Sequence, residues 1–154
     1  AGKKSEQLGL IMFDLDNFKS INDRYGHSTG DWVLKRVIEV IKPICRKQDC
    51  IGRIGGEEFA ILLRASDLES AAAMAERFRE QIAAISTAET GHNFTATASF
   101  GVTTTLSSGY VFDTLLSQSD QALYQSKREG RNRVSKYGAL KSSANFHQEA
   151  STGP

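Results

Sequence analysis

Two points in this 154-residue sequence place carboxylates next to an apolar run. Asp14 directly follows the apolar residues 8–13, and the pair Glu57 and Glu58 directly precedes the apolar residues 59–63. Carboxylates that crowd together repel one another unless cations neutralise them, and such oxygen ligands suit Mg²⁺ together with substrate phosphates. Two such ions could activate an attacking hydroxyl and stabilise a leaving oxygen. The residue types therefore indicate metal-dependent phosphoryl chemistry, provided that the fold brings them together.

Each of these features also has a structural explanation. A Gly-Gly hairpin with exposed glutamates on an edge strand is a common device against aggregation. Asp14 and Asp16 could cap a following helix, and Asp31 could cap the next one. The choice between these explanations depends on which elements carry the carboxylates and where those elements lie.

The hydrophobic pattern of the first half of the chain predicts the elements that would position the carboxylates. Residues 8–13 form a continuous apolar run, which is typical of a buried central strand. Apolar positions at helical spacing, glycine pairs and proline predict the next elements: a short helix over 17–25, a helix from Asp31 to Pro43, and strands 51–54 and 57–63 joined by a Gly55-Gly56 turn.

The second half continues with two helices and two strands. Ser66 and Glu69 predict a capping box that begins a third helix. Residues 94–103 alternate between apolar and polar types, which predicts a half-buried strand, and a last helix from Phe112 ends at Gly130. Residues 134–137 could form a short edge strand. This order predicts an α+β sandwich of the palm-like or ferredoxin-like type, with a mostly antiparallel central sheet flanked by helices.

Composition narrows the class of protein. The net charge of +1 argues against a nucleic-acid partner or a membrane surface, and the longest early apolar run is too short to span a bilayer. Cys45 and Cys50 lack the further ligands that a zinc site needs. We expect a single domain over residues 8–137, an N-terminal extension or cloning remnant over 1–7, and a flexible tail over 138–154. The expected location is cytoplasmic, with membrane anchoring of a parent protein left open.

Four quoted segments resemble the successive signatures of one family. They are "FDLDNFKSINDRYGHSTGD" (13–31), "RIGGEEF" (53–59), "ASFGV" (98–102) and "ALYQSKREGRNRV" (122–134). Together they resemble the GGDEF domain, the diguanylate cyclase. The resemblance implies a palm-like fold and a bacterial second-messenger enzyme dependent on Mg²⁺ or Mn²⁺. That enzyme joins two GTP molecules into cyclic di-GMP and releases two pyrophosphates.

The resemblance also implies roles for individual residues. The metal ligands would be Asp14, the main-chain carbonyl of Leu15, Glu57 and Glu58, and the two glutamates would be the catalytic residues, with Glu57 as the proton acceptor. The GTP-binding residues would be Phe18 and Lys19 at a helix start, Asn22 and Asp31 on the guanine, Gly55 and Gly56 against the nucleotide, and Lys127 and Arg131 on the triphosphate. We expect Lys127 and Arg131, four residues apart, to share one helix face.

A second site is implied by the same resemblance. Arg46 and Asp49, in the pattern R-x-x-D, with Arg77, would bind cyclic di-GMP and produce feedback inhibition. The family also implies an active homodimer and an upstream sensory domain. Its usual Asp-x-Leu-Thr and Asn-Arg motifs do not occur in this sequence.

Two other classes of protein remain open at this point. An inactive relative would sense cyclic di-GMP or GTP without turnover, although such relatives typically lose the acidic residues that this chain keeps. A polymerase or adenylate cyclase palm would share the carboxylate chemistry but not the guanine and phosphate residues.

Overall fold

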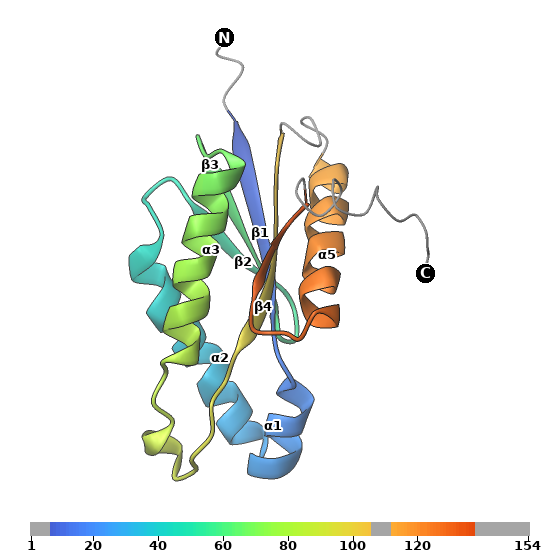
Figure 1. Ribbon diagram of the computed structural model, residues 1–154. Helices are drawn as coiled ribbons and strands as arrows, with labels where there is room; N and C mark the ends of the chain where they lie inside the picture. The colour runs from blue at the N-terminus through green and yellow to red at the C-terminus, as the bar shows by residue number, and fades with distance from the viewer. Residues whose placement is uncertain (1–6, 106–111, 138–154) are drawn as a thin grey trace.

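A computed structural model describes residues 7–105 and 112–137 of the chain (Figure 1). Within these residues one sheet has the strand order β2-β3-β1-β4-β5, with β1 Leu8–Leu15, β2 Cys50–Gly55, β3 Glu58–Arg64, β4 Ala98–Thr104 and β5 Val134–Lys136. The helices are α1 Phe18–Tyr25, α2 His27–Ile41, α3 Leu68–Ala83 and α5 Phe112–Arg128, with the short 3₁₀ segments η1 Lys42–Ile44 and η2 Ala88–Thr90. The expected tail over 138–154, and all but Gln7 of the expected extension, lie outside the described residues.

The central strand is β1, as predicted. It pairs antiparallel with β3 on one side and with β4 on the other, whereas the edge strand β5 pairs parallel with β4. The sheet is therefore mostly antiparallel, and the predicted α+β, palm-like architecture is confirmed. None of the helices among the described residues is long and apolar enough to cross a membrane.

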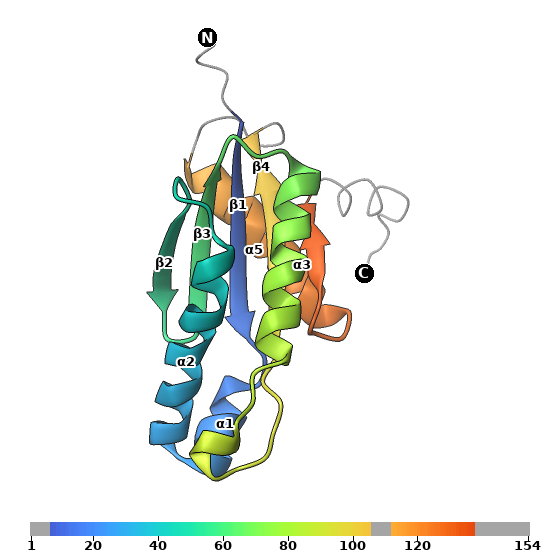
Figure 2. The same ribbon diagram turned by 90° about the vertical axis from the view of Figure 1, so that its left-hand side faces the viewer.

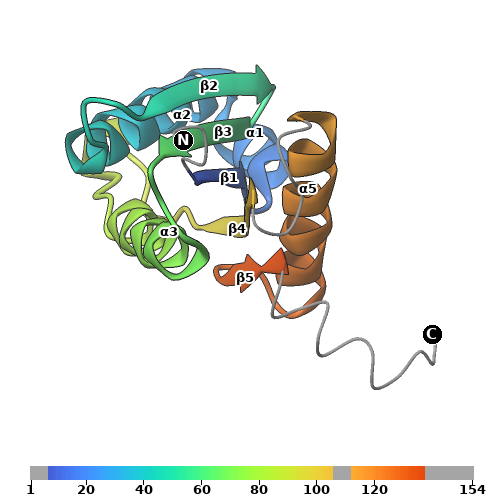
Figure 3. The same cartoon turned by 90° about the horizontal axis from the view of Figure 1, so that it is seen from above.

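Helices cover both faces of the sheet. Figures 2 and 3 show α2 and α3 on one face and α5 on the other, and Figure 1 shows α1 beyond the end of β1. On the face under α2 and α3, the rings of Phe13, Phe59 and Phe100 come from three adjacent strands. Phe13 lies 4.9 Å, centroid to centroid, from each of the other two rings. This aromatic row fixes β1 between β3 and β4 at the level of Asp14.

The opposite face of the sheet packs against α5 without clearance. A Cβ atom on Gly101 of β4 would lie 2.1 Å from the carbonyl oxygen of Ser119 and 2.2 Å from the backbone nitrogen of Leu123. The hydroxyl of Ser126 donates to the carbonyl of Phe100 at 2.7 Å. Small residues on both elements thus let the backbone of α5 rest directly on β4.

The close packing of β4 against α5 shows that the prediction for this strand was partly wrong. The strand covers Ala98–Thr104, shorter than the predicted 94–103 at its start, and all of its residues are buried instead of half of them. The alternation of polar and apolar residues was read as one face in water. In the structure the serine and threonine residues face a close-packed helix instead.

Two predicted element boundaries are also wrong. Helix α2 begins at His27, because Gly26, at φ 95°, ends α1 and the chain enters the next helix at once, so Asp31 lies inside α2 and does not cap it. Helix α3 is capped by Asp67, whose carboxylate accepts from the Ser70 amide at 2.8 Å, and the expected capping box at Ser66 does not form.

The hairpin between β2 and β3 is shifted by one residue from the prediction. Gly55 belongs to β2 and pairs with Glu58, so the turn consists of Gly56 and Glu57. The guanidinium of Arg53 donates to the carbonyl of Gly56 at 2.8 Å and closes the turn from outside. Glu57 therefore stands at the tip of the hairpin, and Glu58 stands at the root of β3.

Candidate active site

The hairpin and the end of β1 bring the predicted carboxylates together. Asp14 pairs in register with Glu58 across the β1–β3 ladder, and the Leu15 amide donates to the carbonyl of Glu57 at 3.3 Å. Asp14 is only 8% exposed, whereas the two glutamates are partly exposed. The sequence predicted that these carboxylates would lie together only if the fold brought the two segments side by side, and the fold does so.

A lysine from the other end of the chain reaches this cluster. The ammonium of Lys127 on α5 forms an ion pair with Oδ2 of Asp14. The second oxygen, Oδ1, is buried and has no hydrogen-bond partner among the described residues. Since buried polar atoms are nearly always partnered, this open oxygen indicates a position for an additional ligand.

The electrostatics of the cluster favour an incoming cation. Burial raises the pKa of Asp14 above its ordinary value, Lys127 opposes this rise, and Glu57 and Asp16 add to it. Burial also raises the pKa of Glu58, with a further contribution from Asp14. Both shifts mean that negative charge is disfavoured here, and a cation would relieve that cost.

These raised pKa values predict a pH effect on stability. The folded protein holds protons on Asp14 and Glu58 more tightly than the unfolded chain does. Between the ordinary and the raised pKa values the unfolded chain binds fewer protons, so the free energy of unfolding falls as pH rises through that window. We expect Glu58→Gln to flatten this fall, as measured by urea denaturation at a series of pH values without divalent ions.

Asp67 provides a control of the opposite sign. Its pKa is lowered by the hydrogen bonds from Ser70, so its contribution to stability is present at higher pH and is lost on acidification. Asp67→Asn should therefore reduce the loss of stability at acidic pH, below the ordinary aspartate pKa, and should leave the fall in the window of Glu58 unchanged. A Glu58→Gln variant with an unchanged slope would contradict the assignment.

The oxygen atoms present fit a magnesium ion. Asp14 offers an open oxygen, Glu57 stands beside it, and the carbonyl of Leu15 follows in the chain. No group of three or more His, Cys, Asp or Glu side chains among the described residues could hold a metal by itself. One or two carboxylates are, however, what Mg²⁺ prefers when waters and phosphate oxygens complete its shell.

The two glycines before the glutamates are not needed for packing. A Cβ atom added to Gly55 or Gly56 would meet nothing within 4 Å, and neither residue has a positive φ. Internal structure therefore does not explain why these positions lack side chains. The bare surface of the hairpin is compatible with the close approach of an external molecule.

A further predicted site residue, Asn22, lies where α1 meets Gly30 of α2. Oδ1 of Asn22 on α1 is buried without a hydrogen-bond partner among the described residues. A Cβ atom on Gly30 would lie 1.8 Å from this oxygen, so the glycine is what makes room for it. The sequence signal for Gly30 was its place in the quoted segment 13–31, but no role was assigned to it.

Asp31 is exposed on α2 and borders a cavity. The volume of this cavity is about 690 Å³, and its lining residues are Asp31, Leu34, Lys35, Ile38, Glu39, Arg53 and Phe59. The lining combines apolar side chains with two carboxylates and two basic groups. Such a mixture suits a flat polar ring that needs both apolar contact and hydrogen bonds.

The other predicted phosphate ligands are placed less directly. Phe18 begins α1 and is buried, whereas Lys19 is exposed and pairs with Asp23 at 3.1 Å. Arg131 lies beyond the end of α5 with φ 66°, so the expectation that it shares a helix face with Lys127 is wrong. Gly130 directs the chain away from the helix axis, and the Arg131 amide donates a hydrogen bond to the carbonyl of Ser126 at 2.9 Å.

Sequence reasoning missed the role of Asp16. Its carboxylate, 5% exposed, accepts hydrogen bonds from Thr97 at 2.7 Å, from Ser99 at 2.6 Å and from the Asn132 amide at 3.0 Å. The only available signal was the second aspartate after an apolar strand, which also fits a helix cap.

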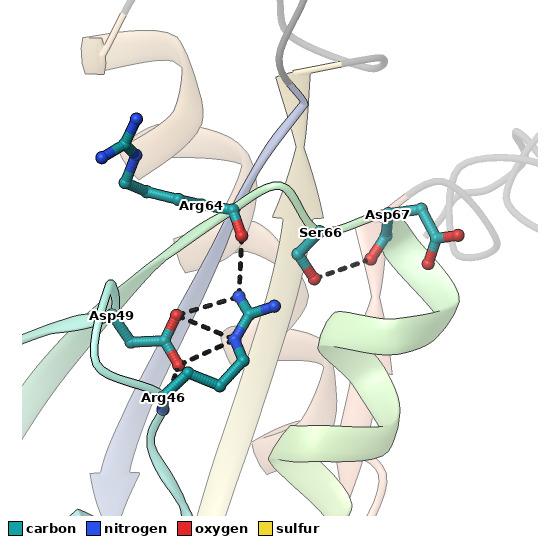
Figure 4. Close-up of polar contacts among 5 residues, drawn as sticks. All are labelled: Arg46, Asp49, Arg64, Ser66 and Asp67. Atoms are coloured by element: carbon teal, nitrogen blue, oxygen red, sulfur yellow. Dashed lines mark hydrogen bonds and ion pairs between the residues drawn. The ribbon is translucent and has the colours of Figure 1, made fainter.

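Two of the three predicted inhibitory residues, Arg46 and Asp49, form a separate cluster, drawn in Figure 4. Nε and Nη2 of Arg46 donate to the Asp49 carboxylate at 2.9–3.2 Å, and Nη2 also donates to the carbonyl of Arg64 at 2.7 Å. Hydrogen bonding to Asp49 raises the pKa of Arg46. A cavity of about 530 Å³ borders both residues. Arg77 is exposed on α3, which contacts the segment η1 before Arg46.

Comparison with known proteins agrees with this geometry. Residues 1–133 match the family described as "Diguanylate cyclase, GGDEF domain". Diguanylate cyclase A of Treponema denticola is 42% identical over 139 residues, covering 87% of this chain and 36% of that protein. Diguanylate cyclase DgcP of Pseudomonas aeruginosa is 40% identical over 127 residues, covering 82% of this chain and 19% of that protein.

Solved structures give the same result. The active GGEEF domain of a diguanylate cyclase from Vibrio cholerae superposes with a TM-score of 0.82 at 36% identity, covering 89% of this chain and 86% of that one. The GGDEF domain of DgcB from Caulobacter crescentus, solved in complex with c-di-GMP, also gives 0.82, at 31% identity over 88% of this chain and 81% of that one.

The sheet, the Asp14 cluster and the Gly-Gly-Glu-Glu hairpin define a palm-like domain with a carboxylate site suited to metal and phosphate. The chain belongs to the GGDEF domain family, the diguanylate cyclases. It spans about a third or less of the length of the two curated relatives described above.

Proposed function

We propose that this chain is an active diguanylate cyclase domain, which joins two GTP molecules into cyclic di-GMP and releases two pyrophosphates. The observation that carries the proposal is the site itself. Asp14, with one open and buried oxygen, faces an intact Gly-Gly-Glu-Glu hairpin, and Lys127 reaches the same point from α5. A pure sensor of cyclic di-GMP would have no need for this carboxylate arrangement.

Asp14, Glu57 and the carbonyl of Leu15 would hold Mg²⁺ or Mn²⁺, with Glu58 as a further acidic group. When bound, the metal would supply charge stabilisation at the reacting phosphate and would favour an ionised hydroxyl. Glu57 is the proposed proton acceptor for the 3′-hydroxyl, because it stands at the hairpin tip and is partly exposed.

The remaining residues of the site would bind the nucleotide. Lys127 would act as a point charge and Arg131 as a planar fork on the triphosphate, while Phe18 and Lys19, at the start of α1, would add to phosphate binding. Gly55 and Gly56 leave the hairpin surface bare for the nucleotide. The open oxygen of Asn22 would accept from the guanine amino group.

Guanine selectivity would come from Asn22 and Asp31. The Asp31 carboxylate can accept from N1–H and the amino group of guanine. Adenine presents an acceptor at N1 and would leave this carboxylate without a donor. The cavity beside Asp31 has space for the base.

The active form would be a homodimer, since one domain offers one set of triphosphate ligands and the product needs two GTP molecules. Two antiparallel copies would bring each 3′-hydroxyl to the α-phosphate of the other nucleotide. In a parent protein an upstream sensory domain would control this pairing. The supply of GTP places the reaction in the cytoplasm.

The test is incubation of the chain with labelled GTP and Mg²⁺, followed by chromatography. We expect cyclic di-GMP from GTP and no cyclic product from ATP. The specific activity should rise with protein concentration, because a bimolecular assembly is required. Binding of cyclic di-GMP without any turnover would favour the sensor class. A specific activity that stays constant for a monomer would contradict the homodimer.

Product feedback would act at the cluster of Arg46 and Asp49, with Arg77 as a further contact. We expect Arg46→Ala to relieve inhibition by cyclic di-GMP about tenfold or more, since hydrogen bonds to charged groups contribute that much. The initial rate should change little. Inhibition curves with added product measure the effect.

The same substitution should also lower the melting temperature. Arg46 joins Asp49 to the carbonyl of Arg64, and the Asp49 side chain is buried beneath it. Arg77→Ala, at an exposed arginine, is the matched control for this loss of stability. An Arg46→Ala variant that remains as strongly inhibited as the parent chain would exclude the site.

A further inference from the structure

The carboxylate of Asp16 is fully used inside the protein. Oδ1 accepts from the hydroxyl of Ser99, and Oδ2 accepts from the hydroxyl of Thr97 and from the backbone amide of Asn132. The Asp16 amide donates to the carbonyl of Thr97 at 2.8 Å, which fixes the backbone as well. Unlike Asp14, two residues earlier, Asp16 therefore has no open oxygen for a metal.

The segment that Asp16 holds has an unfavourable backbone conformation. Arg131 and Asn132 follow each other with φ values of 66° and 49°, in the left-handed region that residues with side chains seldom occupy. Two such residues in succession persist only where surrounding contacts enforce them. The segment directly follows Gly130, which lies two residues beyond the end of α5 at Arg128.

Contacts from nearby residues and from other elements hold this conformation. The Arg131 amide donates to the carbonyl of Ser126 at 2.9 Å, Nε of Arg133 donates to the carbonyl of Arg131 at 3.2 Å, and three contacts come from other elements. Oδ2 of Asp16 accepts from the Asn132 amide, Nη1 of Arg79 on α3 donates to Oδ1 of Asn132 at 3.0 Å, and the Phe100 amide donates to the carbonyl of Arg133 at 2.9 Å. Of the three, only the contact with Asp16 reaches the peptide unit that joins Arg131 to Asn132. Apart from the exposed side chain of Arg133, Asp16 is therefore the residue whose side chain holds this peptide unit, and it restricts the direction in which Arg131 leaves the backbone.

We propose that Asp16 is a positioning residue for nucleotide binding: it holds the left-handed turn so that Arg131 is presented to the triphosphate. This inference rests on the proposed function, because it takes Arg131 as a phosphate ligand. Asp16 acts through Asn132 and touches neither nucleotide nor metal.

The sign of the expected effect separates this role from a purely electrostatic one. A carboxylate near a triphosphate repels it, so loss of the charge alone would tighten nucleotide binding. Loss of the anchor would weaken binding, because Arg131 would sample other directions. Asp16→Asn removes the charge and leaves one acceptor oxygen for the three donors that the carboxylate serves, so the Asn132 amide loses its hydrogen bond to a carboxylate.

The first test uses the nucleotide-free chain. In Asp16→Asn, the backbone amides of residues 131–133 should exchange with deuterium about tenfold faster or more, since a hydrogen bond to a carboxylate is lost. Amides in the β1–β3 ladder should keep their protection. Ser99→Ala is the matched control, because it removes a bond to Oδ1 and leaves the Asn132 bond to Oδ2 intact. Unchanged exchange at residues 131–133 in Asp16→Asn would overturn the proposal.

The second test measures binding of 3′-deoxy-GTP with Mg²⁺ by calorimetry, since this analogue lacks the attacking hydroxyl. The Kd should rise about tenfold in Asp16→Asn and less than twofold in Ser99→Ala. Combining Asp16→Asn with Arg131→Ala should give no further weakening beyond Arg131→Ala alone, because both changes remove the same contact. Tighter binding, or losses that add, would overturn the positioning role.

The two tests also distinguish failure of the proposed function. If the unaltered chain does not bind 3′-deoxy-GTP, the assignment of the nucleotide site is wrong. The exchange measurement still decides whether Asp16 anchors the turn.

Discussion

Replacing Asp14 with asparagine is expected to reduce cyclic di-GMP formation by about 1,000-fold or more, because metal-borne charge stabilisation is worth several kcal/mol. The carboxylate is the buried member of the proposed metal site and has the open oxygen. Asparagine keeps the shape and loses the charge. The initial rate with GTP and Mg²⁺ measures the effect, and circular dichroism checks that the fold is kept.

Two control variants test the interpretation of this loss of activity. Asp113→Asn, at an exposed carboxylate in the first turn of α5, should stay within twofold of the parent rate. Asp14→Asn also leaves the Lys127 ammonium without its partner. Urea denaturation of the double variant with Lys127→Met tests whether this unpaired ammonium lowers stability, whereas activity is compared only for the single variant because Lys127 is itself a proposed phosphate ligand. Full turnover in the Asp14→Asn variant would remove this residue from the metal site.

The largest effect on stability is expected at Gly101. A single added methyl group would lie 2.1–2.8 Å from backbone atoms of α5, which cannot move aside as a flexible side chain can. We expect Gly101→Ala to lower the free energy of unfolding by about 3 kcal/mol or more, at or beyond the upper end for overpacked cores. Urea denaturation followed by circular dichroism measures the change.

Gly52 provides the matched substitution. It lies on β2 without a positive φ, and a Cβ atom there would meet nothing within 4 Å. Gly52→Ala should leave the stability unchanged or raise it by up to about 1 kcal/mol. Equal effects of the two alanines would contradict the direct contact between β4 and α5.

The sequence predicted those parts of the site that depend on local pattern. An apolar run that ends in aspartate identified the central strand, and a glycine pair identified the hairpin beside it. Together they placed Asp14 opposite Glu58. Strand pairing follows from such patterns because the side-chain alternation fixes which face each residue occupies.

The rest depends on contacts that local pattern does not encode. Asp16 meets Thr97 and Asn132 across 81 and 116 positions of sequence. Arg131 was expected on a helix face because helical spacing continued past Gly130, yet the backbone turns left-handed there. The burial of both faces of β4 also depended on α5, whose small residues gave no hydrophobic signal on that side.

The ion pair of Lys127 with Asp14 joins residues 113 positions apart. During synthesis from the N-terminus, β1 and the hairpin emerge long before α5. A nascent chain that has not reached Lys127 must therefore carry the Asp14 carboxylate without its internal counterion, on a sheet face that α5 does not yet cover. Long-range contacts of this kind form late in folding. The carboxylate site is thus completed only by α5, the last helix among the described residues, and a chain interrupted before α5 would combine uncovered apolar strands with an uncompensated charge.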